Sequence, residues 1–149
     1  MNKPLNNNLL LELHIPDFNV AKDFYGKLGF KIAVEDPITE EYCGYLTMVH
    51  KDPAGDTLLA FYGGDEKVYD QSYFKNFPRD TKRGYGVELT VPVKDVRKKY
   101  GEVQGVLGKF VVQEMKEKRD HEHVWYDFRM EDPFGYYLRF TDLLDWGQG

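Results

Sequence analysis

A nine-residue pattern occurs twice in this chain, once in each half. Residues 51–59 and 131–139 both contain Asp-Pro, one further residue, Gly, two residues and Leu, and Asp52 and Asp132 are 80 positions apart (132 − 52). Pro sets φ, Gly permits φ > 0 and Asp can accept a hydrogen bond from the backbone ahead, so the pattern predicts a tight turn. One such turn before an apolar strand in each half predicts a duplicated unit, with the function in the cleft between the copies.

The first half predicts the order β-α-β-β-β. A strand at 9–15 alternates between an apolar face and a mixed face, which consist of Leu9, Leu11, Leu13 and Ile15, and of Leu10, Glu12 and His14, respectively. Asp17 or Asn19 can cap the helix that follows, and Gly29 ends it. Strands at 30–35, 42–50 and 57–62 complete the unit.

The same order is predicted again from residue 87. A strand at 87–91 is followed by a helix at 93–103 and by strands at 110–115, 123–130 and 136–141. Glu88 and Thr90 form the polar face of the first of these strands. We predict that the apolar strand residues pack under the helices; besides the four in the first strand they are Val87, Leu89, Val91, Leu138 and Phe140.

These elements define the domain organisation. We expect a flexible arm at 1–8, a first module at 9–62, a crossover at 63–84, a second module at 85–141 and a tail at 142–149, all within one domain. The crossover is long and aromatic, and a loop of that length is usually functional or partly structured.

The composition limits the kinds of binding partner that we expect for this chain. No run approaches the roughly 20 apolar residues that span a bilayer, and the first residues lack a signal-peptide stretch, so no membrane partner is expected. The single cysteine, Cys43, excludes an internal disulfide and favours the cytoplasm. A net charge of −5 argues against a nucleic-acid partner and is compatible with cationic ligands.

Three segments together resemble the vicinal-oxygen-chelate superfamily, which includes glyoxalase I, extradiol dioxygenases and the bleomycin-resistance proteins. They are residues 11–17 (LELHIPD), 20–30 (VAKDFYGKLGF) and 132–140 (DPFGYYLRF). The resemblance covers about 9–141. It implies an α+β fold in which two tandem β-α-β-β-β modules form curved mixed sheets, each with a concave face.

Metal-using members of that superfamily place a His or Glu on the first and last strand of each module. The resemblance carries these positions to Leu10, to Leu59 or Ala60, to Glu88 and to Arg139. One carboxylate is too few to hold zinc or Mg²⁺, and a guanidinium repels a cation. We therefore expect no metal and no other cofactor, and an ion pair between Glu88 and Arg139 instead.

Residues 87–90 and 138–141 resemble the second module of the bleomycin-resistance proteins. This implies a homodimer that sequesters a small molecule, such as a cationic antibiotic, in crevices at its interface, without a catalytic group. Two alternatives stay open. The chain could be an enzyme of the same superfamily (a lyase, isomerase or dioxygenase-like protein) with Glu88 or His14 as general base, or its cleft could serve only as a dimer interface.

The expected ligand contacts combine polar strand residues with aromatic rings. Acidic side chains and rings attract cations, and rings give flat apolar contact. The candidates are Glu12, His14, Tyr45, Glu88, Thr90, Trp125, Tyr137 and Arg139. His121 and His123 could share a strand face, but the charged run before them predicts an exposed hairpin tip rather than a metal site.

Overall fold

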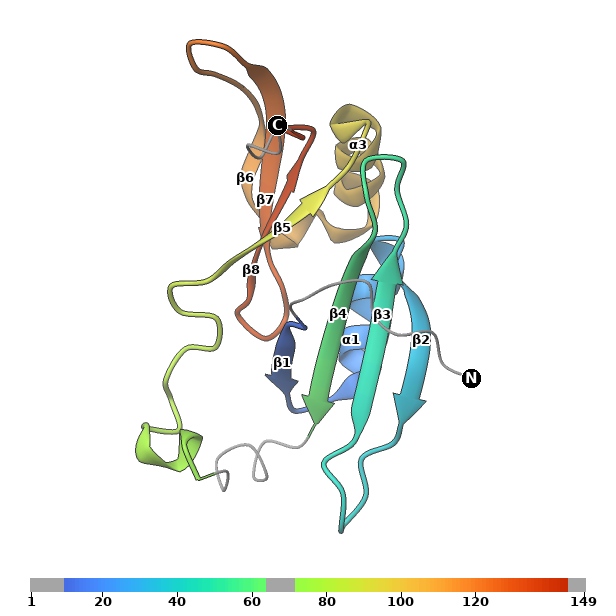
Figure 1. Ribbon diagram of the computed structural model, residues 1–149, viewed down its shortest axis with the longest axis vertical. Helices are drawn as coiled ribbons and strands as arrows, with labels where there is room; N and C mark the ends of the chain where they lie inside the picture. Colours follow the sequence, from blue (N-terminus) through green and yellow to red (C-terminus); the bar gives the residue numbers. More distant parts are fainter. Residues whose placement is uncertain (1–9, 64–71, 145–149) are drawn as a thin grey trace.

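The computed structural model describes residues 10–63 and 72–144 (Figure 1). The elements, in chain order, are β1 (Glu12–Ile15), α1 (Phe18–Lys27), β2 (Lys31–Asp36), β3 (Tyr45–His50), β4 (Thr57–Gly63), the 3-10 turn η1 (Phe74–Asn76), β5 (Glu88–Pro92), α3 (Val96–Leu107), the 3-10 turn η2 (Gly108–Phe110), β6 (Val111–Arg119), β7 (Val124–Glu131) and β8 (Tyr137–Thr141). The predicted arm, Leu9, part of the crossover and most of the tail lie outside the described residues.

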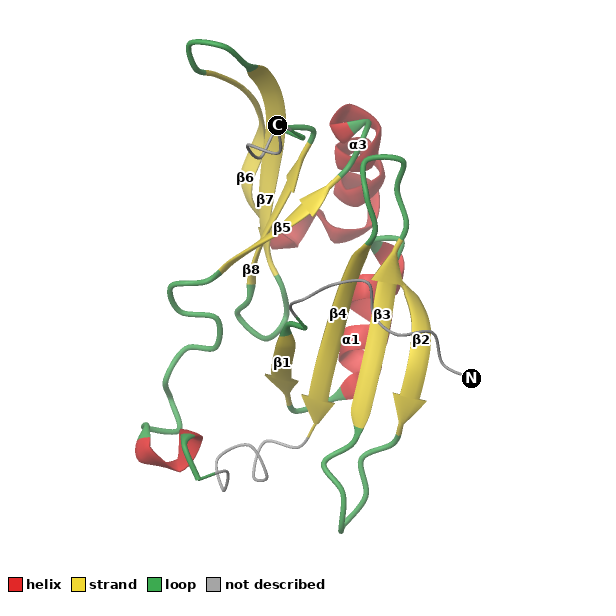
Figure 2. Ribbon diagram, viewed as in Figure 1, coloured by secondary structure: helices red, strands yellow, loops and turns green. Residues whose placement is uncertain are grey.

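The strands form two four-stranded mixed sheets with the same connectivity (Figure 2). The first sheet has the order β1-β4-β3-β2 and the second has the order β5-β8-β7-β6. In each sheet the first and last strands of the module pair in parallel, and the other pairs are antiparallel. The predicted α+β fold with two tandem β-α-β-β-β modules is therefore confirmed.

Aspartate side chains cap the N-termini of the two α-helices that the structure describes. Asp17 Oδ1 accepts a hydrogen bond from the Asn19 amide at 2.7 Å, and Asp95 Oδ1 accepts one from the Lys98 amide at 3.0 Å. Each bond satisfies a backbone donor that has no partner within the helix. Because Asp95 is the cap, the second helix starts at Val96, three residues later than the pattern predicted.

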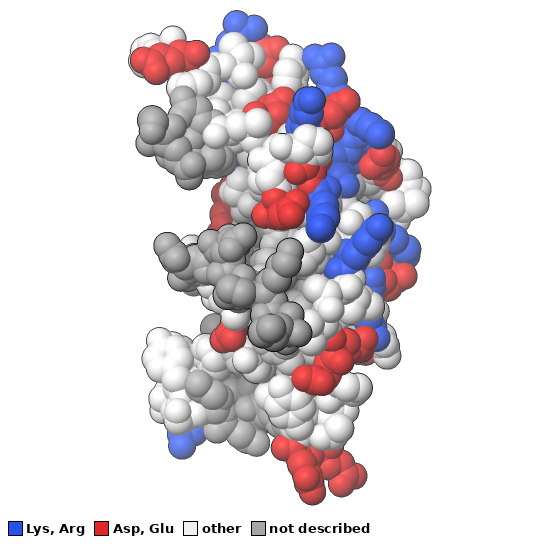
Figure 3. Space-filling view, turned by 45° about the vertical axis from the view of Figure 1, so that its right-hand side comes forward, with Lys and Arg blue, Asp and Glu red and all other residues white. Residues whose placement is uncertain are grey.

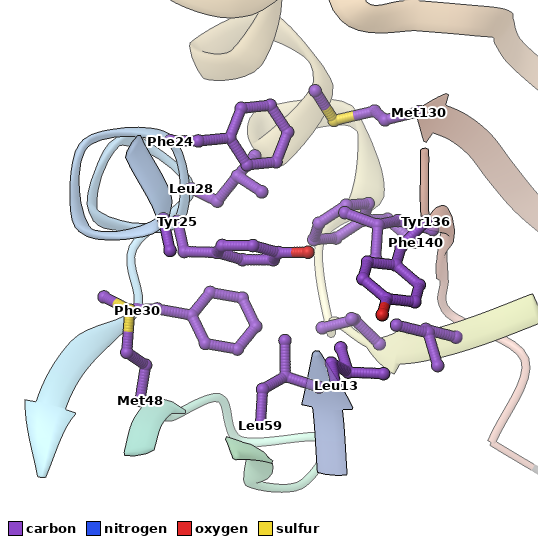
Figure 4. Packing of buried hydrophobic residues seen from close by; sticks show 14 of the residues in the cluster. Leu13, Phe24, Tyr25, Leu28, Phe30, Met48, Leu59, Met130, Tyr136 and Phe140 are labelled. Atoms are coloured by element: carbon purple, nitrogen blue, oxygen red, sulfur yellow. The ribbon is translucent and has the colours of Figure 1, made fainter. Parts of the chain in front are cut away.

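The core confirms the predicted strand register. The strand residues Leu13, Ile15, Leu89, Leu138 and Phe140 are buried in one apolar cluster with side chains from α1, as Figure 4 shows in part. Leu11 is partly buried against that cluster. The prediction for Val87 is wrong, because this side chain is 46% exposed. β5 begins only at Glu88, so Val87 precedes the strand and does not share its buried face.

The two repeated turns join the modules to each other. Asp132 Oδ1 accepts from the backbone ahead, as predicted, while its Oδ2 accepts a 2.6 Å hydrogen bond from the Tyr25 hydroxyl on α1. Asp52 Oδ1 likewise accepts from Ala54 N at 2.9 Å and from Lys94 N of the second module at 2.8 Å. Each copy of the pattern therefore supplies a turn to its own module and a contact to the other.

The modules lie end to end along the long axis of the molecule, and α1 covers one face of the first sheet (Figure 1). α1 also contacts α3, which packs against β6 and β7. The face of each sheet that points away from its helix is called here its open face, since no described helix covers it. In the part of the chain that the structure describes, no helix is both long and apolar enough to span a bilayer.

Candidate functional site

The open face of the first sheet gathers aromatic rings around one carboxylate. Glu12 and His14 project from β1, and the β1–β4 register places them beside Ala60 and Tyr62. The Tyr62 ring stacks on His14 at 5.5 Å between centroids and meets Tyr45 edge-on at 5.0 Å. Three predicted ligand residues therefore meet at Tyr62, which sequence reasoning missed.

The charge of Glu12 affects the pKa values of these side chains. Burial, the Glu12 charge and a hydrogen bond to Glu12 raise the pKa of Tyr62 to about 12, so its hydroxyl stays protonated and donates to the carboxylate. Burial and Glu12 also raise the pKa of Tyr45. Burial lowers the pKa of His14, and Glu12 opposes this shift only in part. At neutral pH the cluster therefore carries one negative charge among neutral rings.

The open face of the second sheet carries a network of charges. Glu88 Oε2 accepts a 3.2 Å hydrogen bond from Arg129, whereas Glu88 Oε1 lies 3.9 Å from Arg139 Nε. The predicted Glu88–Arg139 pair is thus present at the longer distance, and Arg129 is the closer partner of Glu88. Arg129 was missed because it is opposite Arg139 only through the β7–β8 register.

Asp127 forms the floor of this network and is 1% exposed. Its Oδ2 accepts hydrogen bonds from Arg139 Nε at 3.2 Å and from Trp125 Nε1 at 3.3 Å, and its Oδ1 accepts one from Gln113 at 3.0 Å. This buried carboxylate therefore has a charged and a neutral donor on Oδ2 and a neutral donor on Oδ1. Asp127 therefore fixes the orientation of Trp125 and Arg139, two of the predicted residues.

The other predicted residues of the second module lie beside this network. Tyr137 accepts a 3.2 Å hydrogen bond from Arg129, whose guanidinium also lies 5.6 Å from the Tyr137 ring centroid. Thr90 is opposite Arg139 in the β5–β8 register. Five of the predicted residues thus gather on the second sheet and three on the first, and the two sheets lie end to end along the molecule (Figure 1).

Two cavities flank residues 82–87. One has a volume of about 430 Å³ and is lined by Glu12 and His14 together with aromatic residues of the crossover. The other, of about 470 Å³, lies beside Glu88 and Tyr137, near an ion pair of 3.0 Å between Lys82 and Glu131. The crossover is therefore part of both cavities.

The residues at the family's metal positions do not fit a metal ion. Leu59 packs in the core, so the position on the open face belongs to Ala60, and only Glu88 of the four has a ligand atom for a divalent ion. That carboxylate is hydrogen-bonded to Arg129. No three His, Cys, Asp or Glu side chains within 10–63 and 72–144 lie close enough together to hold a metal. His123, at the hairpin tip, contacts Asp120 at 3.1 Å.

Similarity to solved structures decides the fold family. UcmS2 is 26% identical with a TM-score of 0.62, over 91% of this chain and 98% of that one. A bleomycin-binding protein complexed with bleomycin is 17% identical with a TM-score of 0.56, over 91% and 98% of the two chains. A glyoxalase/bleomycin resistance protein/dioxygenase from Alicyclobacillus acidocaldarius is 19% identical with a TM-score of 0.54, over 92% and 93%.

The chain has the vicinal-oxygen-chelate fold. No family profile matches the sequence, and no curated protein sequence matches it either. The vicinal-oxygen-chelate fold is thus evident in the arrangement of the chain, while identity to the compared structures stays low.

Surface charge is mixed on the face shown in Figure 3. Lys and Arg side chains gather toward the upper right of that view, and acidic side chains lie among and below them. Such alternation gives pairs of opposite charge rather than one continuous basic field.

Proposed function

We propose that this protein is a metal-independent, cytoplasmic small-molecule-binding protein. Its ligand is a cationic or amphipathic compound, held in crevices at a homodimer interface. The observation that carries the proposal is the ring cluster around Glu12, in which Tyr45, Tyr62 and His14 surround one negative charge. Each favourable cation–π contact contributes about 0.5–2 kcal/mol. The solved structure of a bleomycin-binding protein with bleomycin supports this class of ligand.

The separation of the two open faces supports the proposed dimer. Glu12, His14 and Tyr45 lie on one sheet, whereas Glu88, Trp125 and the other three candidates lie on the second. A partner chain related by a two-fold axis would place the first sheet of one protomer against the second sheet of the other, twice. Each of the two resulting crevices then contains all eight candidate residues.

Calorimetric titration with bleomycin, followed by other cationic antibiotics, tests this proposal. We expect one ligand per crevice and a loss of about tenfold in affinity for Glu12→Gln or Glu88→Gln, which corresponds to about 1.4 kcal/mol. Val106→Ser, on the exposed side of α3, is the control and leaves binding unchanged. Absence of binding to every cation tested contradicts the proposal.

Mixing the two variants tests the shared crevice. In a Glu12→Gln/Glu88→Gln heterodimer, one crevice contains both substitutions and the other contains neither. Unfolding and refolding the mixture should therefore restore tight binding at one site per heterodimer. If each crevice forms within one chain, the mixture binds no better than the separate variants.

The enzyme alternative is less well supported by the geometry. Arg129 donates to Glu88, so this carboxylate is already paired as an ion rather than placed as a proton acceptor. Product analysis of any bound compound, with and without protein, distinguishes the two functions. Conversion of the ligand contradicts sequestration.

A further inference from the structure

A pocket beside β1 adjoins the open face of the first sheet and shares Glu12 and His14 with it. One wall is β1 itself, with Leu11 and His14, and the other consists of aromatic residues of the crossover, among them Tyr73, Phe74 and Phe77. Its volume of about 430 Å³ falls in the range typical of small-molecule sites. The pocket is thus an aromatic-walled space next to the first sheet.

The rings of the crossover form a continuous surface. The Phe74 ring meets His14 edge-on at 5.0 Å, and Tyr73 lies 5.5 Å from Phe74 and 5.3 Å from Phe77 between centroids. Tyr73 and Phe77 are 62% and 46% exposed. Adjacent exposed rings on a loop indicate a contact surface, since soluble proteins rarely expose contiguous apolar side chains without a binding role.

The floor of the pocket is rigid. Tyr136 is 7% exposed, and its hydroxyl donates a 2.9 Å hydrogen bond to the backbone carbonyl of His14. Gly84 lets the crossover approach this floor, because a Cβ on Gly84 would lie 2.7 Å from the Tyr136 ring. A fixed floor and a closely applied wall give the pocket a defined shape before any ligand binds.

The polar groups of the pocket specify an uncharged ligand with one hydrogen-bond donor. Glu12, Lys82 and Arg83 line it with both signs of charge, and Lys82 is paired with Glu131 at 3.0 Å. Among the residues that the structure describes, none hydrogen-bonds to the buried Nδ1 of His14. Burial lowers the pKa of this imidazole, which favours the neutral ring. The Nδ1 atom of the neutral ring can accept a hydrogen bond from an N–H or O–H group of a ligand.

We propose that the pocket between β1 and residues 73–85 binds a neutral planar aromatic compound that donates an N–H or O–H to His14. The pocket shares Glu12 and His14 with the first open face of the proposed crevice, but it requires neither the second sheet nor the cationic ligand. Phe74 and Tyr136 contact the faces and edges of the compound, and His14 fixes its orientation.

Fluorescence titration with N-phenyl-1-naphthylamine tests this site, because the probe is uncharged, aromatic and carries one N–H. We expect saturable binding that weakens about tenfold or more in Phe74→Ala, because the probe loses an apolar ring contact. Thr81→Trp fills the pocket from its exposed rim and should block the probe without altering the core. His14→Phe keeps a ring but removes the acceptor, so it should weaken binding about 2- to 10-fold.

Two glycines provide a matched control. Gly84 and Gly86 have φ of +72° and +75°, so alanine strains the backbone similarly at both, but only at Gly84 does it meet Tyr136. Gly84→Ala should therefore weaken binding of the probe more strongly than Gly86→Ala does. Equal effects would show that backbone strain, rather than the approach to Tyr136, explains the loss.

The remaining outcomes distinguish probe binding at this site from occupation of the pocket by the chain itself and from ligand binding in the proposed crevice. Val106→Ser, on the exposed side of α3, should leave probe binding unchanged, and saturable probe binding supports the site even if no cation binds the crevice. The proposal is overturned if the probe does not saturate, if binding survives both Phe74→Ala and Thr81→Trp, or if it appears only after deletion of residues 1–9. The last result would mean that the chain itself occupies the pocket.

Discussion

The Tyr25 hydroxyl lies 2.6 Å from Oδ2 of Asp132, and both groups are buried where the two modules meet. Tyr25 comes from the first helix and Asp132 from the repeated turn of the second module. A buried carboxylate needs donors on each oxygen, and here the backbone amides of Phe134 and Tyr136 donate to Oδ1 while the Tyr25 hydroxyl donates to Oδ2. The hydrogen bond therefore makes the ionic state of Asp132 depend on the contact between modules.

Replacing Tyr25 by Phe should destabilise the protein by about 1–3 kcal/mol, because a buried acceptor loses its donor while the apolar ring is kept. Urea denaturation followed by circular dichroism measures the change. Tyr42→Phe, at an exposed ring in the loop before β3, is the control and should change stability by less than about 0.5 kcal/mol. Equal stability of Tyr25→Phe and wild type would show that the hydrogen bond is not needed.

Replacing Asp127 should reduce the stability of the protein more than replacing a surface carboxylate. Asp127→Asn keeps the shape of the side chain but leaves Arg139 and Arg129 facing a neutral amide, so we expect a loss of about 3 kcal/mol. Glu117→Gln, in the exposed cluster with Arg119 and Tyr126, should cost less than about 1 kcal/mol. A ranking in the opposite order would contradict the role of Asp127 as the floor of the second open face.

Unfolding should show a pH dependence that arises from His50. This residue is 3% exposed, and burial, with a further contribution from Lys99, lowers its pKa below 6.5, against the opposing charges of Asp52 and Asp56. The unfolded chain then binds more protons than the folded one, so the contribution to stability is present above pH 6.5 and is lost as the pH falls through the folded pKa.

Replacing His50 should reduce the dependence of the free energy of unfolding on pH. His50→Phe should show a smaller decline in the free energy of unfolding than wild type below pH 6.5, whatever its absolute stability. His121→Ala, at the exposed hairpin tip, should retain the wild-type decline. Identical slopes for His50→Phe and wild type would assign the acid sensitivity to other groups.

Removal of metal ions by a chelator should leave the thermal stability and the ligand affinity of the protein unchanged. Of the four metal positions of the superfamily, only Glu88 has a ligand atom, and Arg129 occupies one of its oxygens. We therefore expect the same melting temperature and the same ligand affinity before and after dialysis against EDTA. Stoichiometric zinc, iron or manganese in untagged protein, lost in Glu88→Ala, would contradict this expectation.

Association should be measurable by sedimentation velocity. We expect a homodimer at micromolar concentration, since the candidate ligand residues are divided between two open faces. Thr90→Arg adds a long charged side chain to the centre of the second open face and should weaken dimerisation about tenfold or more. Val106→Arg on α3 is the control. A wild-type monomer at this concentration would remove the basis of the shared crevice.

Local patterns predicted the fold because each depends on neighbours in sequence. Period-two alternation identified the buried faces of β1 and β5, and the Asp-Pro turns and the Asp17 cap act within a few residues of themselves. The prediction was wrong for Val87 because alternation does not show where a strand begins.

The site was less accessible from sequence because it depends on pairing between distant strands. The approach of Arg129 to Glu88 requires the β7–β8 and β5–β8 registers together, and neither is encoded in residue spacing. Tyr62 was missed for the same reason, since β4 reaches His14 only through the parallel pairing. The aromatic crossover was recognised as unusual, but its contact between Phe74 and His14 needed the structure.

The two open faces also bear on how assembly ends. When the first sheet of one molecule covers the second sheet of another, one face of each kind is left over. A two-fold axis would join the remaining pair of faces and close the dimer, whereas a head-to-tail contact would give a ring or, where its rotation does not close, a filament. In the proposed dimer, the geometry that lets two chains share a crevice would therefore also prevent the protein from polymerising.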